Sequence, residues 1–368
     1  MGKMSTHDNM MAVYRNLPVE EFPVAIYNRY LPRGAKEKEY RQLGLSIIQY
    51  HPVTTLLAPP WHLNPGFLSE VKGADFKIAH HWENDEIIET RTYETKVGTV
   101  RQHTKKDPVY GSDWIEKYYI TKPEDYKVME YIVNNTVFKS NANTTKRMME
   151  ELAGDGVVLG RIDRSPFQKL LVELAGPERF LLDISSGVKE AESLLEAMFS
   201  KMEEVFPHIA ECPAEVIWQP ENVTGEMTPP PFFKKYCMGY YEKLGQVSKQ
   251  AGKPYVVHLD GRLKSLGELI KDCPFDCIES FSYPEVGNDL SFSEARALWP
   301  DKVIIPNFPS SLCSESDDKI KSYLKEKMAE AGFDKPYMMQ ISEDIPHGQW
   351  QRVIPLLIEC VKRLTKGE

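Results

Sequence analysis

The chain has 368 residues, of which 42% are hydrophobic and 27% are charged, and its net charge is -9. This composition supports a large core, and the length fits either two average domains or one α/β barrel with insertions. The negative charge argues against a broad nucleic-acid surface. No stretch approaches the roughly 20 apolar residues of a membrane span. The N-terminus also lacks the apolar core of a signal peptide, so we expect a cytoplasmic protein without a membrane partner.

The first part of the chain predicts an extension and an inserted hairpin. Residues 1–22 are polar and contain several methionines, and we interpret them as a lead-in to a single domain over residues 23–368. Within about 86–105, apolar or β-branched residues alternate with polar ones, and the pattern turns near Gly98. Such alternation around a glycine is typical of an antiparallel β-hairpin.

From Gly156 onward, short apolar runs alternate with amphipathic stretches. The run G-V-V-L-G-R-I-D predicts a strand, and the following S-P-F-Q-K-L-L-V-E-L-A-G predicts a helix that begins at Ser165 and Pro166. This alternation requires a parallel sheet with helices outside it. We therefore predict an α/β fold, a (β/α)8 TIM barrel with an N-terminal extension and an inserted β-hairpin. Neither a G-x-G-x-x-G nor a P-loop motif occurs, which argues against dinucleotide and P-loop chemistry.

Polar side chains follow several of the predicted strands. The segment K-P-Y-V-V-H-L-D-G-R-L brings His258 and Asp260 to the end of an apolar run. Other strand ends carry Glu221, Glu279, Asn307 and Glu343. In an α/β barrel the catalytic groups come from the C-terminal ends of different strands. We therefore expect these side chains to meet at the barrel mouth.

His258 is a candidate metal ligand or general base, or else a hydrogen-bonded structural histidine. Clustered carboxylates around it repel one another unless a cation or a proton intervenes, which favours a functional role. Cys237, near the start of the preceding predicted helix, could complete a tetrahedral zinc site with an open position. It could equally be a small hydrophobic side chain packed under the barrel. Glu279 would need a metal, an arginine or a substrate hydroxyl as partner, or would form a strand-end salt bridge.

Two further groups are candidate substrate-binding residues. Asn28, Arg29 and Arg33, in Y-N-R-Y-L-P-R-G, could clamp an anion, since guanidinium groups match carboxylate geometry. Pairing of the arginines with Glu37 or Glu39 would explain them equally well. One side of a pocket for a ring-shaped ligand could consist of Trp61, His80, His81 and Trp82. This hypothesis is weaker, because aromatic residues belong more often to the core.

Several longer segments, in this order and spacing, resemble the uroporphyrinogen decarboxylase superfamily. They include L-P-R-G-A-K-E-K-E-Y-R-Q-L-G-L, G-K-P-Y-V-V-H-L-D-G, F-D-C-I-E-S-F-S-Y-P-E-V-G-N-D-L-S and D-K-V-I-I-P-N-F-P-S-S. Within it, the chain is most similar to corrinoid-dependent methyltransferases of the O-demethylase type. The resemblance implies a (β/α)8 barrel and a zinc-assisted transfer of a methyl group from a methoxylated or methylated small molecule to a corrinoid carried by a separate protein.

The resemblance assigns a role to His258, and the polar residues at the predicted strand ends supply the other candidates. His258 corresponds to the histidine of the family's H-x-D/C-G motif and is the expected zinc ligand, helped by Cys237 and by Glu221 or Glu343. Glu279, Asp260 and Asn307 are the expected catalytic residues. Asp260 stands where thiol-methylating members carry cysteine, and this favours demethylation of a methyl donor.

Two alternatives stay open beside the methyltransferase. One is a decarboxylase of a tetrapyrrole acid, in which Arg29, Arg33 and Arg161 would hold carboxylates. The segment Y-N-R-Y-L-P-R-G replaces the R-Q-A-G-R-Y of the decarboxylase proper, which argues against that substrate. The other is a non-catalytic corrinoid- or tetrapyrrole-binding barrel.

The expected partners are a corrinoid protein and a small-molecule methyl donor, without nucleic acid, and a homo-oligomer is possible.

Overall fold

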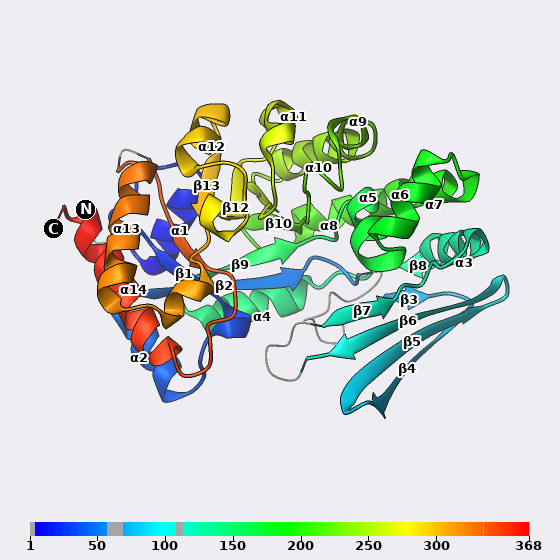
Figure 1. Ribbon diagram of the computed structural model, residues 1–368, viewed down its shortest axis with the longest axis horizontal. Coiled ribbons are helices and arrows are strands. Elements are labelled where there is room, and N and C mark those ends of the chain that lie inside the picture. The colour runs from blue at the N-terminus through cyan, green and yellow to red at the C-terminus, as the bar shows by residue number, and fades with distance from the viewer. Residues whose placement is uncertain (1–3, 57–68, 108–112, 334, 368) are drawn as a thin grey trace. The chain divides into compact units, whose positions relative to one another are not determined.

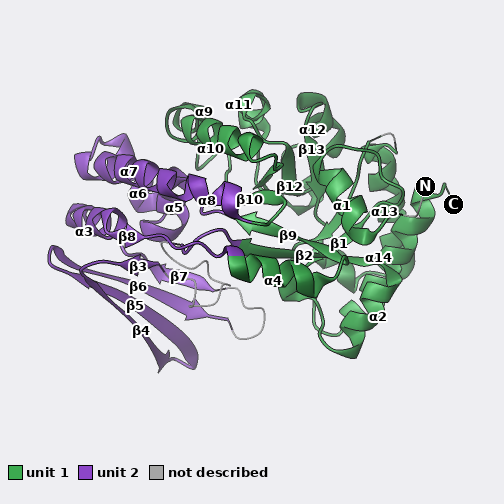
Figure 2. Cartoon of the chain, turned by 180° about the vertical axis from the view of Figure 1, so that it is seen from behind, with its two compact units in different colours: residues 1–51, 143–161, 213–368 green, residues 52–142, 162–212 purple. Residues whose placement is uncertain are grey.

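The computed structural model describes residues 4–56, 69–107, 113–333 and 335–367. The chain divides into two compact units (Figure 2). Unit 1 comprises residues 1–51, 143–161 and 213–368, and unit 2 comprises residues 52–142 and 162–212. Trp61, one of the aromatic residues considered above, lies outside the described residues.

Unit 1 contains the barrel (Figure 1). In the described chain, eight parallel strands follow one another in the order β13-β12-β11-β10-β9-β2-β1-β14. The strands are β1 Val24–Tyr27, β2 Leu45–Pro52, β9 Gly156–Arg161, β10 Val216–Pro220, β11 Tyr255–His258, β12 Cys277–Phe281, β13 Val303–Pro306 and β14 Met339–Ile341. A parallel bridge from Asn307 to Gln340 links the two ends of this order, so the predicted (β/α)8 barrel is confirmed.

The strands are buried on both faces, as expected where helices cover a closed parallel sheet. Every residue of β9, β10 and β12 is buried, and β9 contributes Val157, Val158 and Leu159 to the core. The helices of unit 1 are α1 Thr6–Tyr14, α2 Ala35–Leu43, α4 Ala142–Leu152, α9 Pro230–Phe232, α10 Met238–Gln250, α11 Gly267–Asp272, α12 Phe292–Leu298, α13 Asp317–Ala331 and α14 Trp350–Thr365.

The N-terminal segment expected to be a polar lead-in contains helix α1. Ser5 caps the helix by accepting a hydrogen bond from the backbone N–H of Asp8, and the Asp8 carboxylate accepts one from the backbone N–H of Ser5. Met10, Val13 and Tyr14 are almost completely buried. The capping box fixes where the helix begins, and its apolar side chains attach it to the core of unit 1.

Unit 2 contains the expected hairpin as part of a larger sheet. Its strands are β3 Glu70–Val71, β4 Ala74–Glu83, β5 Glu86–Thr95, β6 Gly98–Lys106, β7 Trp114–Lys117 and β8 Thr136–Val137, and its helices are α3 Pro123–Asn134, α5 Pro166–Lys169, α6 Pro177–Ser185, α7 Lys189–Met202 and α8 Phe206–Glu211. Strands β5 and β6 pair antiparallel from Ile87 and Lys106 to Thr95 and Gly98. Strands β4 and β7 extend this pair on either side. None of the described helices is both long and apolar enough to cross a membrane.

The close approach of β9 to β2 leads to a stability prediction. A Cβ atom added at Gly156 would collide with the backbone oxygen of Ile47. We expect Gly156→Ala to destabilise the protein by about 1–3 kcal/mol, because the two strands would have to separate. Gly239→Ala is the control, since a Cβ at this position in α10 meets no atom within 4 Å and alanine favours a helix. Urea unfolding of both variants checks the prediction, and equal stabilities would contradict it.

Candidate active site

A buried carboxylate lies at the C-terminal end of the barrel strands. Glu279 belongs to β12 and has no exposed surface. Its two oxygens accept hydrogen bonds from four other strands. The donors are Tyr27 Oη at 2.5 Å, Trp218 Nε1 at 2.9 Å, His258 Nδ1 at 2.8 Å and Gln340 Nε2. A buried charge is tolerated only when it is paired and hydrogen-bonded, and Glu279 meets both conditions.

Glu279 and His258 form a charged pair. Burial alone would lower the pKa of His258, but the Glu279 and Asp260 carboxylates raise it from 6.5 to about 10. Burial would raise the pKa of Glu279, whereas the charge of His258 and the hydrogen bonds from His258 and Tyr27 keep it below its usual value. At neutral pH the pair is therefore a carboxylate and an imidazolium.

The pair fixes the orientation of the imidazole ring. Because Nδ1 donates to Glu279, the other ring nitrogen is left for chemistry. His258 Nε2 lies 3.5 Å from Asp260 Oδ2. Trp218 meets the imidazole edge to face, with ring centroids 5.8 Å apart. The arrangement therefore places a proton on Nε2 when His258 is charged, and a lone pair on the same atom when His258 is neutral.

An unusual backbone conformation follows Glu279. Ser280 has a φ of 61°, and the register between β12 and β13 shifts between Glu279 and Phe281. Ser280 Oγ lies 2.7 Å from Ser342 Oγ, and the Ser342 hydroxyl and backbone N–H both donate to Asn307 Oδ1. A left-handed conformation at a residue other than glycine costs about 1–3 kcal/mol and is often found at functional sites. Asn307, expected to be catalytic, thus supports the β-bulge formed by this register shift and helps to orient Glu279.

Two arginines and several aromatic rings surround this pair. Tyr50 stacks on Trp218 with ring centroids 5.1 Å apart. The Arg161 guanidinium lies 5.8 Å from the Trp218 ring centroid, and Arg29 lies 4.5 Å from that of Tyr30. Burial raises the pKa of Tyr50, and the charges of Arg161 and Arg29 oppose this shift, so both cations are near its hydroxyl. Both arginines therefore lie near Tyr50, whose ring stacks on Trp218, and Trp218 in turn contacts His258.

The other candidate substrate-binding residues are Arg33, Asn28 and Trp82. Arg33 is exposed, donates to the Asn28 side chain at 2.9 Å and lies 3.7 Å from Glu37. Asn28 also donates to Gln49. Trp82 belongs to β4 of unit 2, where 72% of its surface is exposed. Arg33 thus forms the surface pair with Glu37 that we considered as the alternative to an anion clamp.

The candidate metal ligands do not form a complete set in the described side-chain positions. Cys237 ends the turn Phe233–Cys237 before α10, Glu221 follows β10, and both are fully buried. Desolvation and the charge of Asp260 raise the pKa of Glu343, which places this carboxyl near the mouth. Across the described residues, no three His, Cys, Asp or Glu side chains are positioned to hold a metal ion together. In these positions the candidate ligands are not assembled around one point, and the zinc ligand set that the resemblance implies stays a prediction.

Three important side chains were not anticipated from the sequence: Tyr27, Trp218 and Gln340. Each is a polar or hydrogen-bonding residue within an otherwise apolar predicted strand, V-A-I-Y, V-I-W-Q or Y-M-M-Q-I. A donor placed inside a buried strand needs a partner, and this was the available signal. Which acceptor they share depends on how the strands are ordered in the barrel.

Comparisons with known proteins extend these findings. The sequence matches the family model described as uroporphyrinogen decarboxylase (URO-D) over residues 104–364. A search among curated proteins gives no match. Among solved structures, a methyltransferase from Methanosarcina mazei is similar with a TM-score of 0.55 and 13% identity, over 98% of this chain and 99% of that chain. This likeness shows a common fold.

A second solved structure is less similar. The octameric ribulose-1,5-bisphosphate carboxylase/oxygenase from Pyrococcus horikoshii OT3 has a TM-score of 0.38 and 8% identity, over 100% of this chain and 64% of that chain.

The charged pair leads to a prediction about the His258 pKa. Replacing Glu279 with glutamine removes the nearest anion, so we expect Glu279→Gln to lower the pKa of His258 by about 1–3 units. An NMR titration of the imidazole signals checks this value. Glu221→Gln removes an equally buried carboxyl from a neighbouring strand end and is the matched control. An unchanged His258 pKa in Glu279→Gln would contradict the pairing.

Proposed function

Because the chain belongs to the uroporphyrinogen decarboxylase family, we propose that it is an enzyme of the methyltransferase kind that removes a methyl group from a small molecule. The observation that carries the proposal is the buried Glu279–His258 pair, which leaves His258 Nε2 as a proton donor at the barrel mouth. The solved methyltransferase from Methanosarcina mazei supports the proposal only through its fold. We propose, from the family resemblance, that the methyl acceptor is a corrinoid on a separate protein.

The reaction we propose breaks the bond between oxygen and a methyl group. An alkoxide or phenolate is a poor leaving group unless its oxygen gains a proton. The His258 imidazolium donates the Nε2 proton to this oxygen while the acceptor takes the methyl carbon, and Glu279 stabilises the imidazolium before transfer. Asp260, 3.5 Å from Nε2, is placed to accept a hydrogen bond from the same nitrogen and to orient it.

This chemistry favours methoxylated donors over methylated ammonium compounds. A quaternary ammonium leaves as a neutral amine and needs no proton, so a buried imidazolium would bring it little benefit. Arg29 and Arg161, beside the aromatic rings, suit a donor that carries a carboxylate or a phenolic oxygen. We therefore propose a methoxylated aromatic or similar small molecule as the methyl donor.

The two arginines also support a second candidate, decarboxylation of an organic acid. Arg161 is almost fully buried, and a buried guanidinium next to Trp218 could hold a substrate carboxylate. The protonated His258 could then supply the proton that replaces carbon dioxide. Release of carbon dioxide from a porphyrinogen-like acid, without methyl transfer, would decide for this candidate.

We expect His258→Gln to reduce kcat/KM for methyl transfer by about 10²–10⁴-fold, because the proton donor is lost. The assay incubates the enzyme with reduced cobalamin and a panel of methoxyaromatics and methylamines, and follows methylcobalamin by absorbance. Since the imidazolium is the active form, wild-type activity should fall as the pH rises through about 10. Arg33→Gln, on an exposed arginine, is the control. No turnover with any methoxylated compound, or full activity of His258→Gln, would count against the proposal.

Zinc binding is a separate prediction that competes with the step above. Because His258 Nδ1 donates to Glu279, zinc would have to bind Nε2 in place of the proton, and metal analysis decides between the two. From the family resemblance we expect one zinc ion per chain after zinc-replete purification, with His258 among its ligands. Elemental analysis of the wild type, His258→Ala and Cys237→Ser measures this directly. Less than one zinc per chain, together with no change in His258→Ala, would rule the expected site out.

A further inference from the structure

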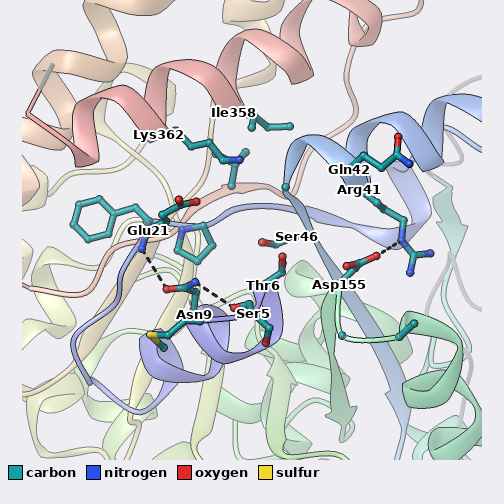
Figure 3. A pocket seen from close by; sticks show the side chains of 17 residues that line it. Ser5, Thr6, Asn9, Glu21, Arg41, Gln42, Ser46, Asp155, Ile358 and Lys362 are labelled. Carbon is teal, nitrogen blue, oxygen red and sulfur yellow. Dashed lines mark hydrogen bonds and ion pairs between the residues drawn. The ribbon is translucent and has the colours of Figure 1, made fainter. Parts of the chain in front are cut away.

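A polar cavity lies in unit 1 at the N-terminal ends of the barrel strands, the end opposite to Glu279. Its volume is about 410 Å³, within the range of small-molecule sites. Helix α1, the starts of β1 and β2, the loop before β9 and helix α14 all contribute to its lining (Figure 3). None of the residues of the proposed active site lines this cavity, so that function does not explain it.

The first hydrogen-bond donor in the cavity is the Ser46 hydroxyl. Ser46 lies near the start of β2, is 1% exposed and lines the cavity. In the described part of the chain, its hydroxyl has no hydrogen-bond partner. Ser46 Oγ is not among the described side-chain atoms that are both shielded from solvent and without a partner, so it reaches the cavity and can donate to water or to a ligand there. Ser46 therefore offers a donor to whatever occupies the cavity.

The second donor is the Lys362 ammonium on α14, which also lines the cavity. Lys362 Nζ donates to the Leu43 carbonyl at 2.6 Å. The absence of a side chain at Gly44 makes room for it, since a Cβ there would lie 2.7 Å from Nζ. The lysine is thus held by the C-terminal end of α2. An ammonium has three N–H groups, so the bond to Leu43 leaves two for a ligand.

One of the two acidic side chains that line the cavity is already paired with a cation. Asp155 is engaged by Arg41, whose Nε lies 2.8 Å from Asp155 Oδ2. Arg41 also donates to the Leu152 carbonyl, which fixes this ion pair to the loop before β9. Glu21 is the other acidic residue of the lining. Thr6, in the first turn of α1, adds a hydroxyl, whereas Asp8 already compensates the positive end of this helix dipole.

We propose that this cavity binds a small molecule through an anionic oxygen group, a carboxylate or a phosphate, that accepts hydrogen bonds from Ser46 and Lys362. The bound molecule would join α1, β2 and α14 at the closed end of the barrel. It would occupy a site separate from the methyl donor and independent of the reaction proposed above. In TIM barrels this end serves stability rather than catalysis, so the ligand acts as a stabilising or regulatory effector.

Isothermal titration with inorganic phosphate, and in a second arm with malonate, tests the proposal on the full chain. We expect saturable binding of at least one of the two anions, and the stronger one identifies the group. Ser46→Ala and Lys362→Met should each weaken that binding by about tenfold or more, because each removes a hydrogen bond to a charged group. Circular dichroism confirms that each variant is folded before titration.

Lys366→Met is the matched control, since Lys366 follows the same helix α14 and does not line the cavity. It should bind the anion as the wild type does. The proposal would be overturned if neither anion bound saturably, if both Ser46→Ala and Lys362→Met bound like the wild type, or if Lys366→Met lost as much affinity as Lys362→Met. A crystal soaked in tungstate, with an anomalous peak beside Ser46 and Lys362, would support it directly.

Discussion

The buried carboxylate of Glu279 is the constraint on which the rest of the barrel mouth depends. An ionised carboxylate without exposed surface is stable only if the protein replaces the hydrogen bonds that water would have made. Here the replacements come from β1, β10, β11 and β14, so the charge ties together strands that are far apart in sequence. Tyr27 and Glu279 are 252 residues apart. The carboxylate therefore organises both the packing of the barrel mouth and the charge state of His258.

This constraint explains why the backbone of β12 departs from regular geometry. In a regular strand, successive side chains point to opposite faces, and the register fixes where each carboxylate can reach. The left-handed Ser280 and the register shift beside it change the course of the strand directly after Glu279. Ser342 and Asn307 hold the bulge by hydrogen bonds. The strain is localised next to the residue whose position matters most, as is common at functional sites.

The two ends of the barrel differ in chemistry. The C-terminal end gathers a carboxylate–imidazolium pair and two arginines near aromatic rings. The N-terminal end is covered by α1, whose Tyr14 is buried in the core. Beside α1, the cavity with Ser46 and Lys362 carries donors but not the acid–base pair. Parallel strands produce this asymmetry, because all their C-terminal ends lie at the same edge.

The sequence by itself determined the alternation of strands and helices, the hairpin near Gly98 and the polar residues at the strand ends. These features follow from local periodicity and turn chemistry, which short segments carry without help from the rest of the chain. It also indicated that His258, Asp260 and Glu279 would meet, because parallel strands bring their C-terminal ends together. The resemblance to a known family added an expected reaction.

Only the tertiary structure decided which side chains share a hydrogen bond. That Tyr27, Trp218 and Gln340 all donate to Glu279 depends on the order and register of strands from both ends of the chain, which no local pattern encodes. The left-handed conformation of Ser280 is likewise imposed by long-range packing, since serine does not favour it. The same holds for Arg33, which sequence spacing grouped with Arg29 but which the fold turns toward Glu37. Residue type sets what a side chain can do, whereas the closed barrel determines which partner it meets.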